Sequence, residues 1–267
     1  MDQIKEICNI ILNQNLKVCI DTRSNEIINS IFFGIKGVNY NGSEYWKEAI
    51  KKGAKYVVIE NHKESKKNKN VFCVENTTIT LQRVAKLYRT YFDIPVIGIT
   101  GSNGKTSSKN LISTVLSCKY NVCTTLGNYN NHIGVPLTVL NITKKTEIAV
   151  IEMGANHVGE IKKLCEIAQP NYGVITNIGK AHIGSFGGLQ NIIKAKSELY
   201  DYLKKNNGTI FVNKKDLTLK KQIGKYKKYI YYNYSKSGNC NIKNYFQYNI
   251  NTFISIDFNK ISVDTRI

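Results

Sequence analysis

Residues 94–109 read IPVIGITGSNGKTSSK, and this stretch decides the fold. An apolar, β-branched run is followed by two glycines, a lysine and a threonine, which predicts a strand, a phosphate-binding loop and a helix. The two glycines permit the backbone angles and the close approach with which amide N–H groups surround a phosphate. We expect the helix to begin near Ser107 and to direct its positive end to the same point.

The polar side chains of this loop suit a nucleotide. Lys105 would neutralise the outer phosphates, and the Thr106 hydroxyl would hold a Mg²⁺ ion that bridges them. The expected nucleotide-binding residues are Gly101, Ser102, Asn103, Gly104, Lys105, Thr106 and Ser107. Only two residues separate Gly101 from Gly104, fewer than in the common form of this loop. An ordinary strand-to-helix turn is therefore the alternative, which motifs further along the chain argue against.

Length and composition describe a cytoplasmic globular protein. The 267 residues allow two domains with cores of their own. A hydrophobic content of 42% and a mean hydropathy of −0.28 require no membrane span. The first helical stretch is amphipathic and lacks the apolar core of a signal peptide. Seven cysteines without close metal-type pairs indicate free thiols in a reducing cytosol.

The net charge of +19 raises the question of a nucleic-acid partner. Lysine far outnumbers arginine, and the excess is spread along the chain beside many asparagine, isoleucine and tyrosine residues. This distribution favours a solvated surface over a nucleic-acid site. The positive field would still attract anionic ligands such as nucleotides.

The pattern along the chain predicts an α/β protein: a small N-terminal α/β domain at 1–92, then a central domain at 93–267 with a mostly parallel sheet flanked by helices. In the first domain we expect helices at 1–14, 45–52 and 77–91, and strands at 17–20, 30–35, 55–60 and 71–74. In the second, after the phosphate loop, we expect strands at 148–151, 172–177 and 209–212, and helices at 159–168 and 189–204.

Candidate chemical residues follow the strands of the second domain, where ligands of such sheets gather. Glu152 ends a strand and could share a Mg²⁺ ion with Thr106, although an exposed strand-end acid is the plainer interpretation. His182 follows a glycine-bearing turn after the next strand. Lys196 alone reads as a solvated lysine on an amphipathic helix. The polar segment 127–136, which contains Asn131, could present donors to phosphate or carboxylate oxygens, or could be a capped turn.

Taken together, these segments resemble the Mur ligases of peptidoglycan synthesis, which are ATP-dependent amide-forming enzymes. The resemblance rests on five segments of this chain: TGSNGKT at 100–106, GNYNNHIGVPLT at 127–138, EMGANHVGEI at 152–161, TNIGKAH at 176–182 and KAKSELY at 194–200. The second and third are most similar to the branch of the family that adds D-alanyl-D-alanine. In the first domain, DTR at 21–23 and IFFGIKG at 31–37 resemble the family's UDP-sugar-binding domain.

Two positions depart from the family pattern. Where the family usually has Asp-Gly-His, this chain has Asn41, Gly42 and Ser43. Gly184 stands where the family commonly carries an acidic residue.

The resemblance implies a mechanism and its ligands. ATP would phosphorylate the terminal carboxylate of UDP-N-acetylmuramoyl-tripeptide, and the amine of D-alanyl-D-alanine would attack the acyl phosphate. The implied catalytic residues are Lys105, His182, Lys196 and Asn131. Thr106 and Glu152 would hold one Mg²⁺ ion and His182 would help with a second, while Lys196 would be carbamylated and act as a metal ligand. The resemblance further implies a monomer.

Members of the family carry a third, Rossmann-like domain, which we expect to begin soon after strands at 253–258 and 260–264. The resemblance covers the first two domains, clearly to about Val212. Two alternatives to a ligase that adds D-alanyl-D-alanine stay open at this point. One is a truncated, inactive nucleotide-binding remnant, and the other is a sibling ligase that adds a different amino acid.

Overall fold

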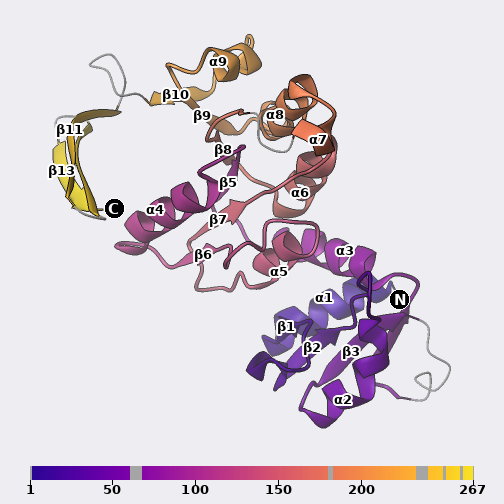
Figure 1. The fold of residues 1–267 in the computed structure, drawn as a ribbon. Helices are drawn as coiled ribbons and strands as arrows, with labels where there is room; N and C mark the ends of the chain where they lie inside the picture. The colour runs from indigo at the N-terminus through magenta and orange to yellow at the C-terminus, as the bar shows by residue number, and fades with distance from the viewer. Residues whose placement is uncertain are drawn as a thin grey trace. The chain divides into compact units, whose positions relative to one another are not determined.

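The computed structural model describes residues 2–60, 68–179, 183–232, 240–248, 251–258 and 261–266. The chain forms two compact units (Figure 1). The first unit comprises Met1–Ile94, Tyr129–Thr146 and Glu166–Gln169, and the second comprises Pro95–Asn128, Glu147–Cys165 and Pro170–Ile267. The expected boundary after residue 92 concerns the domains of the family and stays a prediction. None of the helices that the structure describes is long and apolar enough to cross a membrane.

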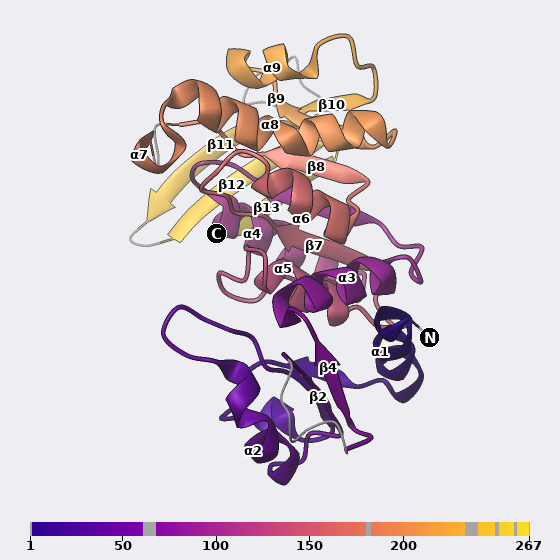
Figure 2. The ribbon, with the colours of Figure 1, turned by 90° about the vertical axis from the view of Figure 1, so that its right-hand side faces the viewer.

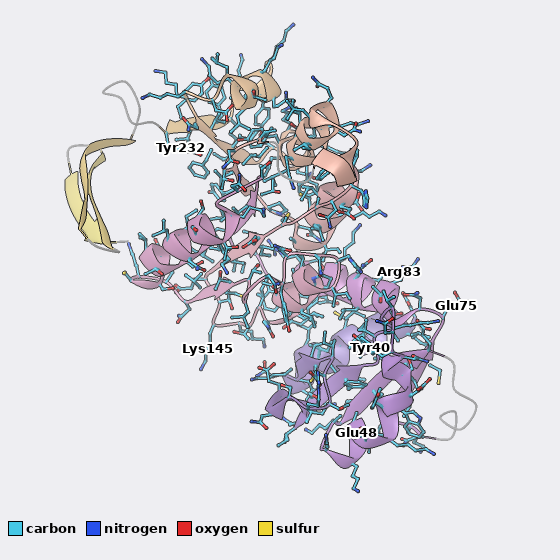
Figure 3. The ribbon with its side chains drawn as sticks, in the orientation of Figure 1. Tyr40, Glu48, Glu75, Arg83, Lys145 and Tyr232 are labelled. Carbon is cyan, nitrogen blue, oxygen red and sulfur yellow. The ribbon has the colours of Figure 1, made fainter. Side chains whose placement is uncertain are left out.

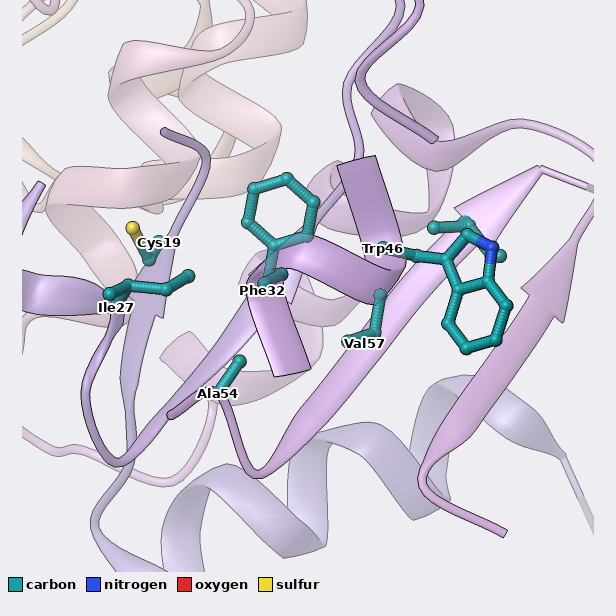
Figure 4. Packing of buried hydrophobic residues seen from close by; sticks show 8 residues of the cluster. Cys19, Ile27, Phe32, Trp46, Ala54 and Val57 are labelled. Atoms are coloured by element: carbon teal, nitrogen blue, oxygen red, sulfur yellow. The ribbon is translucent and has the colours of Figure 1, made fainter. Parts of the chain in front are cut away.

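The first unit is built on a parallel sheet with the strand order β1-β2-β3-β4. Its strands are β1 (Lys17–Cys19), β2 (Ser30–Phe33), β3 (Tyr56–Glu60) and β4 (Val71–Val74). Its helices are α1 (Gln3–Gln14), η1 (Asn25–Ile27), η2 (Gly42–Tyr45), α2 (Trp46–Lys51), α3 (Thr77–Arg89) and α5 (Gly134–Leu140). Figure 4 shows the core on one side of this sheet, where Phe32, Trp46 and Val57 pack together and are buried.

The second unit contains a six-stranded sheet with the order β10-β9-β8-β5-β7-β6, in which all neighbouring strands are parallel. Its strands are β5 (Val96–Thr100), β6 (Val122–Thr124), β7 (Ile148–Glu152), β8 (Tyr172–Ile175), β9 (Thr209–Asn213) and β10 (Tyr229–Tyr232). Its helices are α4 (Lys105–Ser117), α6 (Glu160–Ala168), α7 (Ile183–Phe186), α8 (Leu189–Lys205) and α9 (Leu217–Ile223). The fold is therefore the expected α/β class.

Helices cover both faces of this sheet (Figures 1 and 2). Ile112 of α4 packs with Ile99 and Val150 on one face. On the other face α8 comes very close to the strands, because a Cβ atom at Gly173 would lie 2.5 Å from a methyl carbon of Leu203. This arrangement leaves the carboxyl ends of β5, β7 and β8 at one edge of the sheet, where a ligand can bind.

The last described strands form a separate antiparallel sheet of β11 (Cys240–Tyr248), β12 (Asn251–Phe258) and β13 (Ile261–Arg266). The strands expected at 253–258 and 260–264 are thus confirmed with slightly different bounds. The first strand of this sheet was not predicted.

Three sequence-based assignments need correction. Helix α4 begins at Lys105 and not near Ser107, because Gly104 takes a left-handed conformation and caps the helix two residues earlier. Segment 134–140 is helix α5, with Pro136 in its first turn, where a proline is tolerated. Strand β6 was missed because it has only three residues and gives no clear alternation.

Candidate functional site

The phosphate loop lies between the end of β5 and the start of α4. Gly101 and Gly104 have φ values of 146° and 75°, which residues with a side chain rarely adopt. A Cβ atom at Gly101 would also lie 2.0 Å from Oγ1 of Thr176. Because α4 starts directly after the loop and runs for 13 residues, its N-terminal amides and the loop face the same place. This is the arrangement that binds an anion at a helix N-terminus.

The turn that follows β8 forms hydrogen bonds to the phosphate loop. The Ser102 hydroxyl donates to the Gly179 carbonyl at 3.1 Å and accepts from the Gly179 N–H at 2.9 Å. The Asn103 carbonyl accepts from the Thr176 hydroxyl at 2.6 Å and from the Asn177 side-chain amide at 3.0 Å. The side chain of Ser102 is therefore engaged with the turn, and its backbone N–H also donates to the Asn177 carbonyl at 3.0 Å. Its role in nucleotide binding stays a prediction.

Lys105 folds back over the loop. Its Nζ donates to the carbonyl of Gly101 at 2.9 Å and to that of Ser102 at 3.1 Å. Burial lowers the pKa of Lys105, and the charge of Glu152 opposes this shift. The carbonyl oxygens that accept from this half-buried ammonium carry only a partial negative charge. An anionic group bound beside the loop amides would supply a full opposite charge.

Thr106 and Glu152 meet at the mouth of the loop. The Thr106 hydroxyl donates to Oε1 of Glu152 at 3.2 Å, and the glutamate is 1% exposed at the end of β7. Mg²⁺ prefers such hard oxygens, and two neighbouring ligands of an octahedral ion lie about 3 Å apart. The pair therefore fits this ion. Within the described ranges there is no group of three or more His, Cys, Asp or Glu side chains that could hold a metal ion.

Lys196 is a buried lysine on α8. It is 4% exposed, and its Nζ donates to the Ala155 carbonyl at 3.3 Å and lies 5.4 Å from the ring centre of Phe186. Burial, and then the charge of Lys105, lower the pKa of Lys196 to about 8. The solvated lysine that its sequence pattern suggests is therefore the wrong interpretation. An amine with this pKa has a larger neutral, nucleophilic fraction near neutral pH than an exposed lysine has.

The segment that faces Lys196 is fixed by two carboxylates that sequence reasoning missed. Glu198 accepts from the backbone N–H of Gly159 at 2.5 Å and of Lys162 at 2.9 Å. Glu160 accepts from the N–H of Asn156 at 2.7 Å and of His157 at 3.1 Å. Both acids stabilise the start of α6. Glu160 is the first residue of this helix, and an acidic residue in the first turn was the signal that could have identified it.

The remaining predicted residues are placed differently. His182 lies outside the described residues, and Ser107 is exposed in the first turn of α4. Asn131 belongs to the first unit, where its side-chain oxygen accepts from the N–H groups of Ile133 at 3.0 Å and Gly134 at 2.9 Å. Asn131 thus caps the start of α5, and its catalytic role stays a prediction.

The first unit contains a pocket of about 480 Å³ that includes the DTR segment. Its lining includes Asp21, Thr22, Arg23, Tyr40, Glu48 and Tyr129. Asp21 accepts two hydrogen bonds from the Arg23 guanidinium, at 2.9 and 2.8 Å, which lower the pKa of Asp21 to about 2. Thr22 donates to Glu48 at 3.1 Å. Figure 3 labels Tyr40 and Glu48 of this pocket, which combines aromatic rings with charges of both signs.

The structure explains the difference from the family pattern at residues 41–43. Ser43 is 2% exposed, and its hydroxyl donates to the Gly34 carbonyl at 3.1 Å and accepts from the Glu60 N–H at 3.0 Å. Asn41 accepts from the Ser43 N–H at 3.2 Å and caps η2. Both side chains therefore hold their own loop together, while Gly42 lines the pocket.

Curated relatives share a large part of the sequence. The UDP-N-acetylmuramoyl-tripeptide--D-alanyl-D-alanine ligase of Bacillus subtilis is 40% identical over 201 residues, which cover 75% of this chain and 44% of the relative. The ligase of the same name from Haemophilus influenzae is 38% identical over 201 residues, covering 74% of this chain and 43% of the relative. The matched segment therefore covers less than half the length of these relatives.

Solved structures show the same fold. MurF from Acinetobacter baumannii matches with a TM-score of 0.79 and 27% identity, over 94% of this chain and 55% of that one. The MurF ligase from Thermotoga maritima in complex with ADP matches with a TM-score of 0.79 and 28% identity, over 94% of this chain and 58% of that one.

The family assignment rests on the second unit above all. The family model described as the Mur ligase middle domain matches residues 99–267, which include the phosphate loop, Glu152 and Lys196. This match takes in more than half of the sequence, and the chain belongs to the Mur ligase family.

Proposed function

We propose that this protein is an ATP-dependent ligase that adds D-alanyl-D-alanine to UDP-N-acetylmuramoyl-tripeptide. The observation that carries the proposal is the 3.2 Å contact between Thr106 and Glu152 at the mouth of a lysine-bearing phosphate loop. It occurs in a chain 40% identical to a ligase of that name. As the chain covers 44% of that relative, the activity and substrates of the whole protein are part of the proposal.

ATP would bind at the phosphate loop. Loop amides and the start of α4 would surround the β- and γ-phosphates, and Lys105 would move from its own loop carbonyls to the phosphate oxygens. The ADP in the related Thermotoga maritima structure supports a nucleotide here. Such a site accelerates phosphoryl transfer mainly by alignment and charge neutralisation.

Thr106 and Glu152 would hold Mg²⁺, which neutralises the charge that develops on the transferred phosphoryl group. Lys196, with the nearby charge of Lys105 and a pKa lowered to about 8, would react with carbon dioxide through its neutral amine to give a carbamate, and the proton that the nitrogen loses would pass to water. This carbamate and His182 would serve a second ion. The reacting tripeptide carboxylate would accept the γ-phosphoryl group and release ADP. The amine of D-alanyl-D-alanine would then displace phosphate from the acyl phosphate to form the amide.

The pocket of the first unit would bind the UDP-sugar part of the tripeptide substrate. Tyr40 and Tyr129 offer aromatic faces, and Arg23 offers a cation that is 86% exposed and open to a diphosphate. We also propose a monomer in the cytoplasm. The described cysteines form no disulfide with one another, which supports that compartment.

The test is a reaction of the 267-residue chain with ATP, Mg²⁺, UDP-N-acetylmuramoyl-tripeptide and D-alanyl-D-alanine, followed by mass detection of the products. We expect ADP formation that requires the UDP-tripeptide, and a product whose added mass is that of D-alanyl-D-alanine. Lys105→Ala is the matched control and should remove both. A product that forms only when another amino acid replaces D-alanyl-D-alanine in the mixture would identify a sibling ligase. Nucleotide binding without stimulation by any UDP-sugar peptide would contradict the proposal and favour an inactive remnant.

A further inference from the structure

Helix α4 presents a polar stripe to the sheet. Thr106, Lys109 and Ser113 are spaced three and four residues apart, which places them on one face of the helix. This face would ordinarily be apolar, since it packs against β6 and β7. Thr106 is exposed at the phosphate loop, whereas Lys109 and Ser113 are buried in the interface between helix and sheet.

Lys109 is the most costly member of the stripe. It is 3% exposed, and its Nζ donates to the Thr125 carbonyl at 2.7 Å. An ammonium removed from water is unfavourable unless it is hydrogen-bonded or paired, and an apolar side chain of similar size would usually pack there at lower cost. Neither the phosphate loop nor the reaction proposed above gives Lys109 a role.

Thr125 connects Lys109 to the proposed metal ligand. Thr125 is 1% exposed and directly follows β6. While its carbonyl accepts from Lys109, its hydroxyl accepts from the backbone N–H of Glu152 at 3.0 Å. Its own N–H donates to the Val150 carbonyl at 3.1 Å. One buried residue thus joins α4 to the last residue of β7.

The third member of the stripe is separate from this link. The Ser113 hydroxyl donates to the side chain of Thr124 at 2.9 Å, one turn further along α4. Ser113 therefore has a similar environment and a hydrogen bond of its own. That hydrogen bond involves neither Thr125 nor Glu152. It offers a matched control.

We propose that Lys109 is a positioning residue, which through Thr125 fixes the end of β7 so that the Glu152 carboxylate faces the Thr106 hydroxyl. The inference rests on the proposed function, because it assigns Glu152 to Mg²⁺. Groups that orient a metal ligand commonly change metal affinity about 10- to 100-fold when they are removed. Lys109 acts on the ligand through one intervening residue and does not touch the ion.

The experiment compares Lys109→Met, Thr125→Val, Thr125→Ser and Ser113→Ala in the full 267-residue chain. The first readout is amide hydrogen exchange at Glu152, without nucleotide or metal, which reports the hydrogen bond to Thr125 directly. The second is the Mg²⁺ concentration that half-maximally enhances ADP binding, measured by calorimetry.

We expect Lys109→Met and Thr125→Val to speed exchange at Glu152 and to raise the required Mg²⁺ concentration about 10- to 100-fold. Thr125→Ser, which keeps the hydroxyl, should restore both values, and Ser113→Ala should leave both unchanged. Wild-type exchange and Mg²⁺ requirement in Thr125→Val would overturn the proposal, even if Lys109→Met does not fold. If the wild-type chain binds no ADP, the proposed function fails, and the exchange rates alone decide whether Lys109 positions Glu152.

Discussion

Two lysines, the half-buried Lys105 and the buried Lys196, define the chemistry at the scale of single residues. Lys105 and Lys196 both have a pKa lowered mainly by burial, and the charge of Lys105 contributes to the shift at Lys196. Like charges held out of water favour an anion between or beside them. A phosphorylated ligand at the loop would relieve this repulsion, whereas a purely structural role would leave it uncompensated.

Lys105→Met should weaken ATP binding about 10- to 150-fold, because a charge-assisted hydrogen bond to phosphate contributes roughly 1.5–3 kcal/mol. Calorimetric titration measures the effect. Lys119→Met is the control, since Lys119 is exposed beyond the end of α4. Equal losses in both variants would show that the lysines act only through net charge.

Lys196→Ala should lower turnover at least about 100-fold while ATP binds nearly as in the wild type, because a group that acts during the reaction contributes little to ground-state binding. Steady-state ADP release and a separate binding titration give the two values. A variant with normal turnover would remove Lys196 from the mechanism.

Asp21 gives a pH prediction. The Arg23 guanidinium lowers the pKa of Asp21 from 3.8 to about 2, so that the ionised form is favoured in the folded state. The stability from this pair is present above pH 3.8 and is lost as the pH falls through about 2. The contribution is small, because Asp21 is 45% exposed and water screens the pair. NMR titration of the carboxyl group should show the low pKa in the wild type and a value near 3.8 in Arg23→Ala.

At the scale of elements, the phosphate loop depends on the turn that follows β8. Thr176 and Asn177 both donate to the Asn103 carbonyl, and Ser102 exchanges two hydrogen bonds with Gly179. The loop conformation is thus formed before any ligand binds, which lowers the entropy cost of binding.

Gly101→Ala should destabilise the protein by about 1–3 kcal/mol and weaken ATP binding, because the new Cβ would meet the Thr176 hydroxyl and the φ of 146° is strained for alanine. Urea unfolding measures the change. Gly184→Ala is the control, since a Cβ there has no neighbour within 4 Å. If the Gly101→Ala protein were as stable as the Gly184→Ala protein, the turn could move away from the new Cβ atom at little cost, and the prediction would be wrong.

The same elements show how far sequence reasoning reached. The phosphate loop, Glu152 and Lys196 were singled out because each belongs to a short motif, and their roles stay predictions. The burial of Lys196 was not predicted, since its pattern alone indicates a solvated lysine. The contacts of Ser102, Thr125 and Glu198 were not found, since their partners lie 27 to 77 residues away in the chain. Helix α5 was read as a polar loop because its entire length is buried, so that tertiary packing and not local propensity forms it.

At the scale of the whole molecule, each compact unit carries one candidate site. The phosphate loop, Glu152 and Lys196 belong to the second unit, and the pocket with Asp21 and Arg23 belongs to the first. Segment 129–146 returns the chain to the first unit and brings Tyr129 to its pocket. A ligase of two large substrates needs two binding sites of this kind, each with its own contacts.

The two sites should therefore lose their ligands independently. Arg23→Ala should weaken UDP binding about 10-fold, through the loss of a charge-assisted hydrogen bond, and leave ATP binding unchanged. Lys105→Met should weaken ATP binding and leave UDP binding unchanged. Separate titrations with UDP and ATP test this, and a variant that loses both ligands while folded would contradict two separate sites.

The proposed function depends most on the assignment of Glu152 and Thr106 to Mg²⁺ beside a bound nucleotide. The most direct measurement is a calorimetric titration of the chain with ADP, with and without Mg²⁺, for the wild type and for Glu152→Gln. We predict that Mg²⁺ tightens ADP binding in the wild type and that Glu152→Gln loses this enhancement while it keeps the Mg²⁺-free affinity. An equal enhancement by Mg²⁺ in both proteins would contradict the account.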